Sequence, residues 1–134
     1  MHRILGYCNP SLIGTLVSKV QVYIDGTFNI VPHPFYQCLI VMVYDVQIVG
    51  YVPVMYILIT GKSESLYWYT LHWIIVASAW KLDQFLVTCD FEVVLHSVVV
   101  GQFKSCKLNG SLFHWKQAIC RKIYFFKSKK SRLL

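Results

Sequence analysis

Apolar and polar positions divide the chain into two regions with different patterns. In the first sixty residues, short apolar runs rich in β-branched and aromatic side chains alternate with turn residues, which is typical of strands joined by short connections. Three such runs follow one another, and they predict a meander of antiparallel strands. The predicted elements are a short helix over residues 11–19 and strands over 20–27, 35–44 and 51–60.

After residue 60 the apolar positions take up helical spacing. Ser63 is a residue type that caps helices, and the apolar positions behind it form one stripe: Leu66, Trp73, Ile74 and Ala77. Because little polar surface lies opposite this stripe, we expect the helix to be buried on most sides, with the "YWY" of residues 67–69 in the core. The remaining predicted elements are a strand over 85–89, a helix over 92–103, a strand over 105–109 and a helix over 112–126.

The order of these elements is β-β-β-α-β-α-β-α. Three antiparallel strands followed by alternating helices and strands predict an α/β fold, in which a mixed sheet carries helices on its faces. A chain of 134 residues is long enough for one core. We therefore expect a lead-in segment over 1–19, one domain over 20–126 and a basic tail over 127–134.

Composition excludes a disordered chain and raises the question of a membrane. Hydrophobic residues make up 56% of the sequence and charged residues 14%. The apolar runs are interrupted by Asp45, Pro53 and His72, and none reaches the roughly 20 apolar residues that a spanning helix needs. The five cysteines are odd in number and form no CxxC pair, which indicates a reducing compartment.

Charge is distributed unevenly along the chain. All six acidic residues lie within residues 1–92, whereas residues 93–134 hold nine Lys or Arg. Such a block is typical of nucleic-acid binding, and a short basic run also serves as a nuclear import signal. Lys116, Arg121 and Lys122 are candidates for contacting DNA phosphates. A solvated tail and a solvated helix face without any partner explain these charges equally well.

Two aspartates at strand positions are the candidate metal ligands. Asp25 lies in "VYIDGTF" and Asp90 directly follows "FLVTC". If the two strands are neighbours, their carboxylates converge and repel unless a cation bridges them. Mg²⁺ prefers such oxygen ligands, and two-metal phosphoryl transfer requires them. The alternative for Asp25-Gly26 is a hairpin turn, which this dipeptide also marks.

Four blocks of the sequence together resemble the transposase domain of Mutator-like elements. They read "VYIDGTFNIVPHPFYQCLIVMV", "YVPVMYILITGKSESLYWYTL", "VTCDFEVVLHSVV" and "GSLFHWKQAICRKI". The resemblance extends from residue 8 to residue 123. It implies a ribonuclease H-like fold and an acidic triad that binds two divalent cations, Mg²⁺ or Mn²⁺, to cleave and join DNA strands. Asp25 matches the first catalytic aspartate of that family and Asp90 matches the second.

The chain departs from the family pattern in two places. The family has a third carboxylate on a downstream helix, but no Asp or Glu follows Glu92 here, so the resemblance implies a domain truncated before that acid. Glu92 itself is better explained as a solvent-facing acid favoured by the helix dipole. Ser111 stands where the family usually has Cys, which leaves His114 without a matching partner, because a hydroxyl does not replace a soft ligand.

These observations lead to a specific functional expectation. We expect part of a DNA transposase catalytic domain, located in the nucleus, that binds DNA and Mg²⁺ or Mn²⁺ and is inactive alone. It is expected to have no membrane partner, and association with the intact transposase remains open. The alternatives are a non-catalytic DNA-binding relic and a small membrane-associated protein, the latter resting on hydrophobicity alone.

Overall fold

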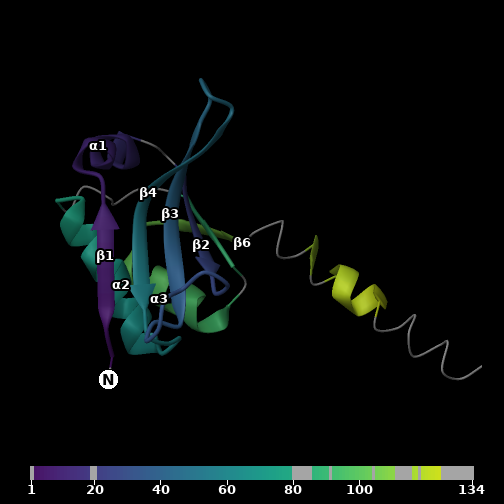
Figure 1. Cartoon of the computed structure of the whole chain (residues 1–134). Helices are drawn as coiled ribbons and strands as arrows, with labels where there is room; N and C mark the ends of the chain where they lie inside the picture. The colour runs from purple at the N-terminus through teal and green to yellow at the C-terminus, as the bar shows by residue number, and fades with distance from the viewer. Residues whose placement is uncertain are drawn as a thin grey trace, which may run out of the picture.

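A computed structural model describes residues 2–18, 21–79, 86–90, 92–103, 105–110, 116–117 and 119–124. These ranges form a six-stranded mixed sheet with helices packed against it (Figure 1). The strands are β1 (Ile4–Cys8), β2 (Gln21–Thr27), β3 (Gln37–Asp45), β4 (Gly50–Ile59), β5 (Leu86–Cys89) and β6 (Lys107–Gly110). The helices are α1 (Pro10–Ser18), α2 (Glu64–Ala77) and α3 (Val93–Gln102).

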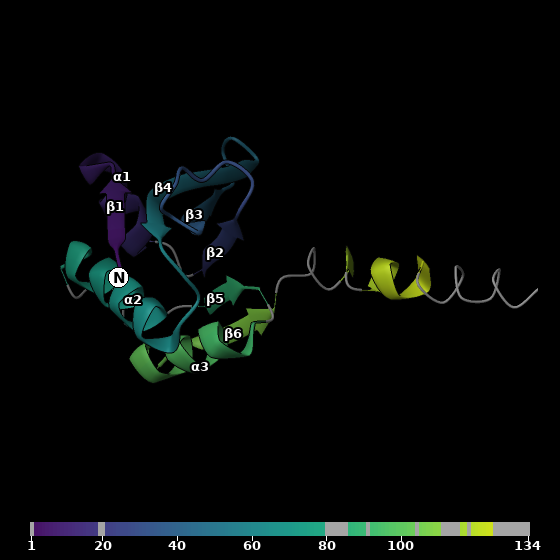
Figure 2. The same cartoon turned by 60° about the horizontal axis from the view of Figure 1, so that its bottom comes forward.

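The strand order is β1-β4-β3-β2-β5-β6. Strands β2, β3 and β4 form an antiparallel meander, and β5 and β6 extend the sheet in parallel from β2. This arrangement confirms the predicted α/β fold with ribonuclease H-like topology. The helices α2 and α3 pack against each other on one side of the sheet (Figure 2).

Strand alternation divides the sheet into a helix-covered face and an open face. Along β2, Val22 and Ile24 are buried in the core shared with α2 and α3, whereas Tyr23 and Asp25 are partly exposed. The open face carries aromatic side chains in edge contacts, with the Tyr23 and Tyr51 ring centroids 4.8 Å apart. The covered face therefore provides the core, and the open face presents polar and aromatic groups.

Strand β1 is a feature that the sequence did not predict. It lies within the expected lead-in segment, yet it pairs antiparallel with β4 from Ile4↔Ile59 to Cys8↔Met55. Its short length and its central Gly6 weaken the strand pattern, because glycine is uncommon in strand interiors. Gly6 is needed for packing, since a Cβ at this position would lie 2.7 Å from the ring of Trp73 on α2.

We expect Gly6→Ala to destabilise the fold by about 1–3 kcal/mol, because the added methyl overpacks the contact between β1 and α2. The matched control is Gly14→Ala in α1, where a Cβ would meet nothing within 4 Å. This control should stabilise by roughly 0.5–1 kcal/mol, because alanine favours the helix. Urea unfolding midpoints measure both changes. Equal midpoints for the two variants would contradict the close packing of β1 on Trp73.

Helix α2 is only partly as expected. Ser63 caps it as predicted, accepting a hydrogen bond from the Leu66 backbone N–H. Tyr67 is buried, but Trp68 and Tyr69 are exposed, so the predicted burial on most sides is wrong. His72 is half-buried and stacks on Trp68 with ring centroids 5.0 Å apart. The His72 imidazole and the Trp68 indole both carry ring nitrogens that can hydrogen-bond to water, so this side of the helix can face solvent.

The predicted C-terminal helix is described only in part. Residues 116–117 and 119–124 are helical and exposed, while His114 and the basic tail over 127–134 lie outside the described residues. Within the helices that the structure describes, none combines the length and the apolarity that crossing a membrane requires.

Candidate functional site

Asp25 lies inside β2 and Asp90 directly follows β5. Strands β2 and β5 are parallel neighbours, as the sequence led us to expect, and the last pair in their register is Ile24↔Cys89. Asp25 and Asp90 each come one residue after this pair. The convergence of their two carboxylates stays a prediction.

The Asp25-Gly26 dipeptide is not a turn. Both residues lie inside β2, where they pair with Ile40 and Leu39 of β3, so the hairpin alternative is wrong. The Asp25 Oδ1 accepts a hydrogen bond from the Gly26 N–H at 2.9 Å. A Cβ on Gly26 would lie 3.0 Å from the Gln37 Oε1, so the glycine allows β2 to pass close to that buried amide.

A buried polar network connects this end of the sheet to the helices. The Tyr67 hydroxyl donates to the Glu92 Oε2 at 2.9 Å and accepts from the Gln37 Nε2 at 2.9 Å. Gln37 also donates to the Gly61 carbonyl at 3.2 Å. Burial raises the pKa of Tyr67, and the Glu92 carboxylate and the charge of Asp90 raise this pKa further. The network therefore ties β3 and α2 to Glu92, the N-cap residue of α3.

The expectation that Glu92 faces solvent is wrong. Glu92 occupies the N-cap position of α3, but its side chain makes no capping hydrogen bond and instead accepts from Tyr67. Within the described ranges, no group of three or more His, Cys, Asp or Glu side chains is placed to hold a metal ion. The candidate metal ligands remain the carboxylates of Asp25 and Asp90. Their hard oxygen donors suit one Mg²⁺, which commonly takes one or two carboxylates together with substrate phosphates.

Cys89 lies directly before Asp90 and belongs to the core. Its side chain is buried, and burial raises its pKa to about 12, with smaller contributions from the charge of Asp90 and from Cys106. All five cysteines are free. Cys89 is therefore a protonated thiol under physiological conditions and supplies packing at the base of the site.

The predicted DNA-contacting residues are accessible. Lys116, Arg121 and Lys122 are exposed on the C-terminal helical segment. Sequence reasoning missed a second group, in which Phe28, Tyr36 and Lys62 meet beyond the end of β2. The available signal was weak: Phe28 and Lys62 lie within two of the blocks that carry the family resemblance, but nothing in the sequence links them to each other.

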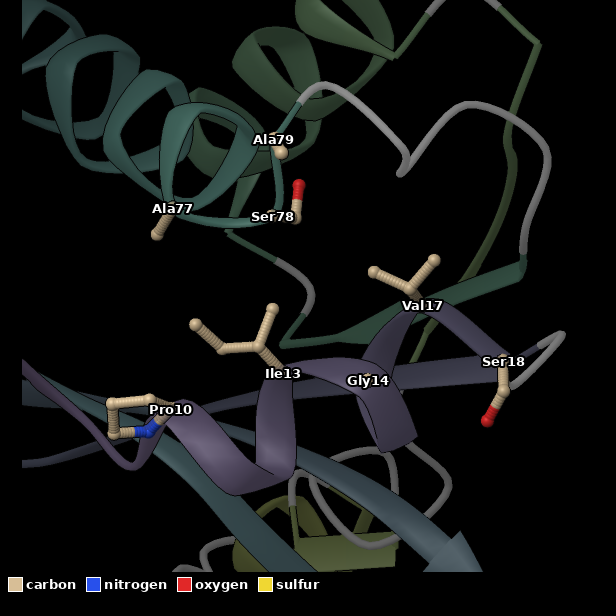
Figure 3. Close-up of a pocket in the computed structure, with 8 residues that line it drawn as sticks. All are labelled: Pro10, Ile13, Gly14, Val17, Ser18, Ala77, Ser78 and Ala79. Carbon is tan, nitrogen blue, oxygen red and sulfur yellow. The ribbon is translucent and has the colours of Figure 1, made fainter.

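A hollow between α1 and the end of α2 is a separate feature (Figure 3). Ile13 and Val17 point from α1 toward Ala77 and Ser78, and the Ser78 hydroxyl donates to the Ile75 carbonyl at 2.7 Å. No ionisable side chain is among the described residues that line it. The hollow thus offers apolar surface and no acid–base or metal chemistry.

No protein-family model matches this chain, no curated protein matches it, and no solved structure matches it.

Proposed function

We propose that this chain is a DNA-binding domain of the Mutator-like transposase type, which holds a divalent cation through Asp25 and Asp90 and does not cut DNA by itself. The observation that carries the proposal is the placement of these two aspartates one residue beyond the last register pair of parallel strands β2 and β5. The four sequence blocks that resemble this family support the same assignment.

The chemistry of the pair follows from its charge. Two neighbouring carboxylates repel each other, and a bound cation relieves this repulsion. When bound, Mg²⁺ or Mn²⁺ would polarise a phosphate of the DNA backbone. Two carboxylates give a second cation no protein ligand of its own, and no acidic residue follows Glu92 in the sequence. Binding without cleavage is the expected result.

Charge supports DNA as the partner and the nucleus as the location. The sequence carries a net charge of +7, and its basic residues are concentrated after position 92. Neutralising phosphates releases counterions from DNA, so this charge supplies affinity without sequence preference.

The first test is Mn²⁺ binding, followed through the electron paramagnetic resonance signal of free Mn²⁺. Asp25→Asn and Asp90→Asn should each weaken binding by about tenfold or more, equivalent to about 1.4 kcal/mol, because each removes one of two anionic ligands. The matched control is Asp45→Asn. Asp45 lies at the β3–β4 turn, where its Oδ1 accepts from the Gln47 N–H, and its removal should leave Mn²⁺ affinity unchanged.

A nicking assay on supercoiled DNA with Mg²⁺ or Mn²⁺ tests the second half of the proposal. The unmodified chain should bind DNA and leave it supercoiled. If the unmodified chain nicks DNA and both Asp→Asn variants do not, another residue completes the site. Glu92 is the first candidate for that residue. Salt-sensitive DNA binding together with unchanged Mn²⁺ affinity in both variants would instead favour the non-catalytic DNA-binding relic.

A further inference from the structure

Three side chains from different parts of the chain meet at the carboxyl end of β2. Phe28 directly follows β2, Tyr36 directly precedes β3, and Lys62 lies shortly after β4. The two ring centroids are 5.5 Å apart with an interplanar angle of 70°. The Lys62 Nζ lies 4.8 Å from the Phe28 centroid and 5.9 Å from the Tyr36 centroid.

This cluster is held in place but remains accessible. The Tyr36 backbone N–H donates to the Ile59 carbonyl at 2.8 Å, which fixes the start of β3 against the end of β4. Phe28 is 46% exposed and Tyr36 is 51% exposed, and Lys62 is exposed as well. Two exposed aromatic rings beside an ammonium group are the components with which proteins bind single-stranded nucleic acid.

The cluster lies near Asp25 along the chain. Phe28 lies three residues beyond Asp25 along the chain, a separation of about 10 Å in extended strand geometry. About three stacked base steps of DNA, at roughly 3.4 Å each, span the same distance. A DNA strand that contacts both Asp25 and the rings would have to span about this distance.

We propose that Phe28, Tyr36 and Lys62 form a stacking platform for an unpaired nucleotide of DNA. The rings stack against the base, which needs no particular base identity because every base has an aromatic face. Lys62 neutralises a phosphate of the same strand. This inference rests on the proposed function for taking DNA as the ligand. It adds one feature of that ligand, namely an unpaired stretch of one strand at the end of β2.

The test is fluorescence anisotropy of a labelled single-stranded 20-mer with the full chain in EDTA. Phe28→Leu and Tyr36→Leu should each weaken binding roughly 5- to 150-fold, the range expected for losing one base–aromatic stack. The same variants should bind a duplex of that sequence within about twofold of the unmodified chain, because stacked bases are not available to the rings. Lys62→Ala should lower the log–log salt slope by about 0.7, the value for one phosphate contact on single strands.

The matched control is Tyr7→Leu, which removes a ring of similar exposure, 57%, from the edge strand β1. Unfolding midpoints of all variants confirm that each is folded. The platform would be overturned if Phe28→Leu and Tyr36→Leu bound the 20-mer as tightly as Tyr7→Leu does. It would also be overturned if these two variants lost as much affinity for the duplex as for the single strand. Tighter ring-dependent binding of the matching RNA 20-mer would overturn the assignment to DNA.

The absence of divalent cation separates this result from the proposed function. In EDTA no cation is bound at Asp25 and Asp90, so strand binding is measured separately from the metal site. If the ring variants bind the 20-mer normally while Mn²⁺ binding depends on both aspartates, only this inference is overturned. If strand binding depends on the two rings but Mn²⁺ binding does not depend on the aspartates, the platform is supported and the metal site is overturned.

Discussion

Replacing Lys116, Arg121 and Lys122 together by Gln is expected to cause the largest loss of duplex DNA binding. The three side chains are exposed on one helical segment. If each contacts one phosphate, their removal lowers the log–log salt slope by about 2.7, because each contact contributes about 0.9. If the variant and the unmodified chain bind equally at about 1 M salt, this change in slope corresponds to an affinity loss on the order of several hundredfold at about 0.1 M salt.

Fluorescence anisotropy with a labelled duplex at several salt concentrations between 0.05 and 0.2 M, about the range over which such affinities change steeply, measures both quantities. Gln117→Ala is the matched control, because it alters the same exposed helical segment without changing its charge. An unchanged slope in the triple variant would mean that this segment is a solvated helix face and that other basic residues carry the binding.

The second large effect is a loss of stability at alkaline pH. Burial raises the pKa of Cys89 from its ordinary value of 9.0 to about 12, and burial also raises the pKa of Tyr67 above its ordinary value of 10.0. In the unfolded chain these groups lose their protons first, while the folded chain retains them. The free energy of unfolding should therefore hold below pH 9. It should fall above pH 9 through Cys89 and above pH 10 through Tyr67 as well, by about 1.4 kcal/mol per pH unit for each group while its folded form stays protonated.

Tyr67→Phe and Cys89→Ala test this pH dependence. At pH 7 Tyr67→Phe should destabilise by about 1–2 kcal/mol, because Gln37 and Glu92 lose their shared partner. Above pH 10 its difference from the unmodified chain should shrink, since phenylalanine has no proton to lose. Urea unfolding at pH 7, 9, 10 and 11 gives the comparison, with Tyr7→Phe as the control for removing an exposed hydroxyl. Parallel pH profiles for Tyr67→Phe and the unmodified chain would contradict the explanation.

The fold was predictable where local pattern and topology agree. The meander from β2 to β4 has β-branched and aromatic runs separated by short turns, and α2 begins at a serine cap, so each boundary has a local signal. Strand β1 has no such signal, because its pairing with β4 depends on a distant segment and its Gly6 is explained only by Trp73. The exposure of Trp68 was not predictable either, because hydrophobic periodicity does not show which side of a helix lacks a packing neighbour.

For the candidate site, the sequence predicted that the strands carrying the two aspartates are neighbours. Asp25 and Asp90 follow apolar runs, and the order of elements makes their strands neighbours. The hydrogen bond from Tyr67 to Glu92 was not predictable, because it joins α2 to the N-cap residue of α3 and depends on the packing angle of both helices. The contact of Lys62 with Phe28 depends in the same way on how the ends of β2 and β4 approach each other.

The edge position of β1 also bears on how the chain folds during synthesis. The meander closes through short connections, whereas β1 pairs with β4 only by closing a loop of about 50 residues, which is the slower and entropically more costly step. On the ribosome β1 emerges before β2 and β3, and its partner strand β4 becomes available only after both have been made. The β1 segment Ile4–Cys8 therefore stays unpaired while the meander forms, and early contacts with a chaperone are expected there rather than on the meander.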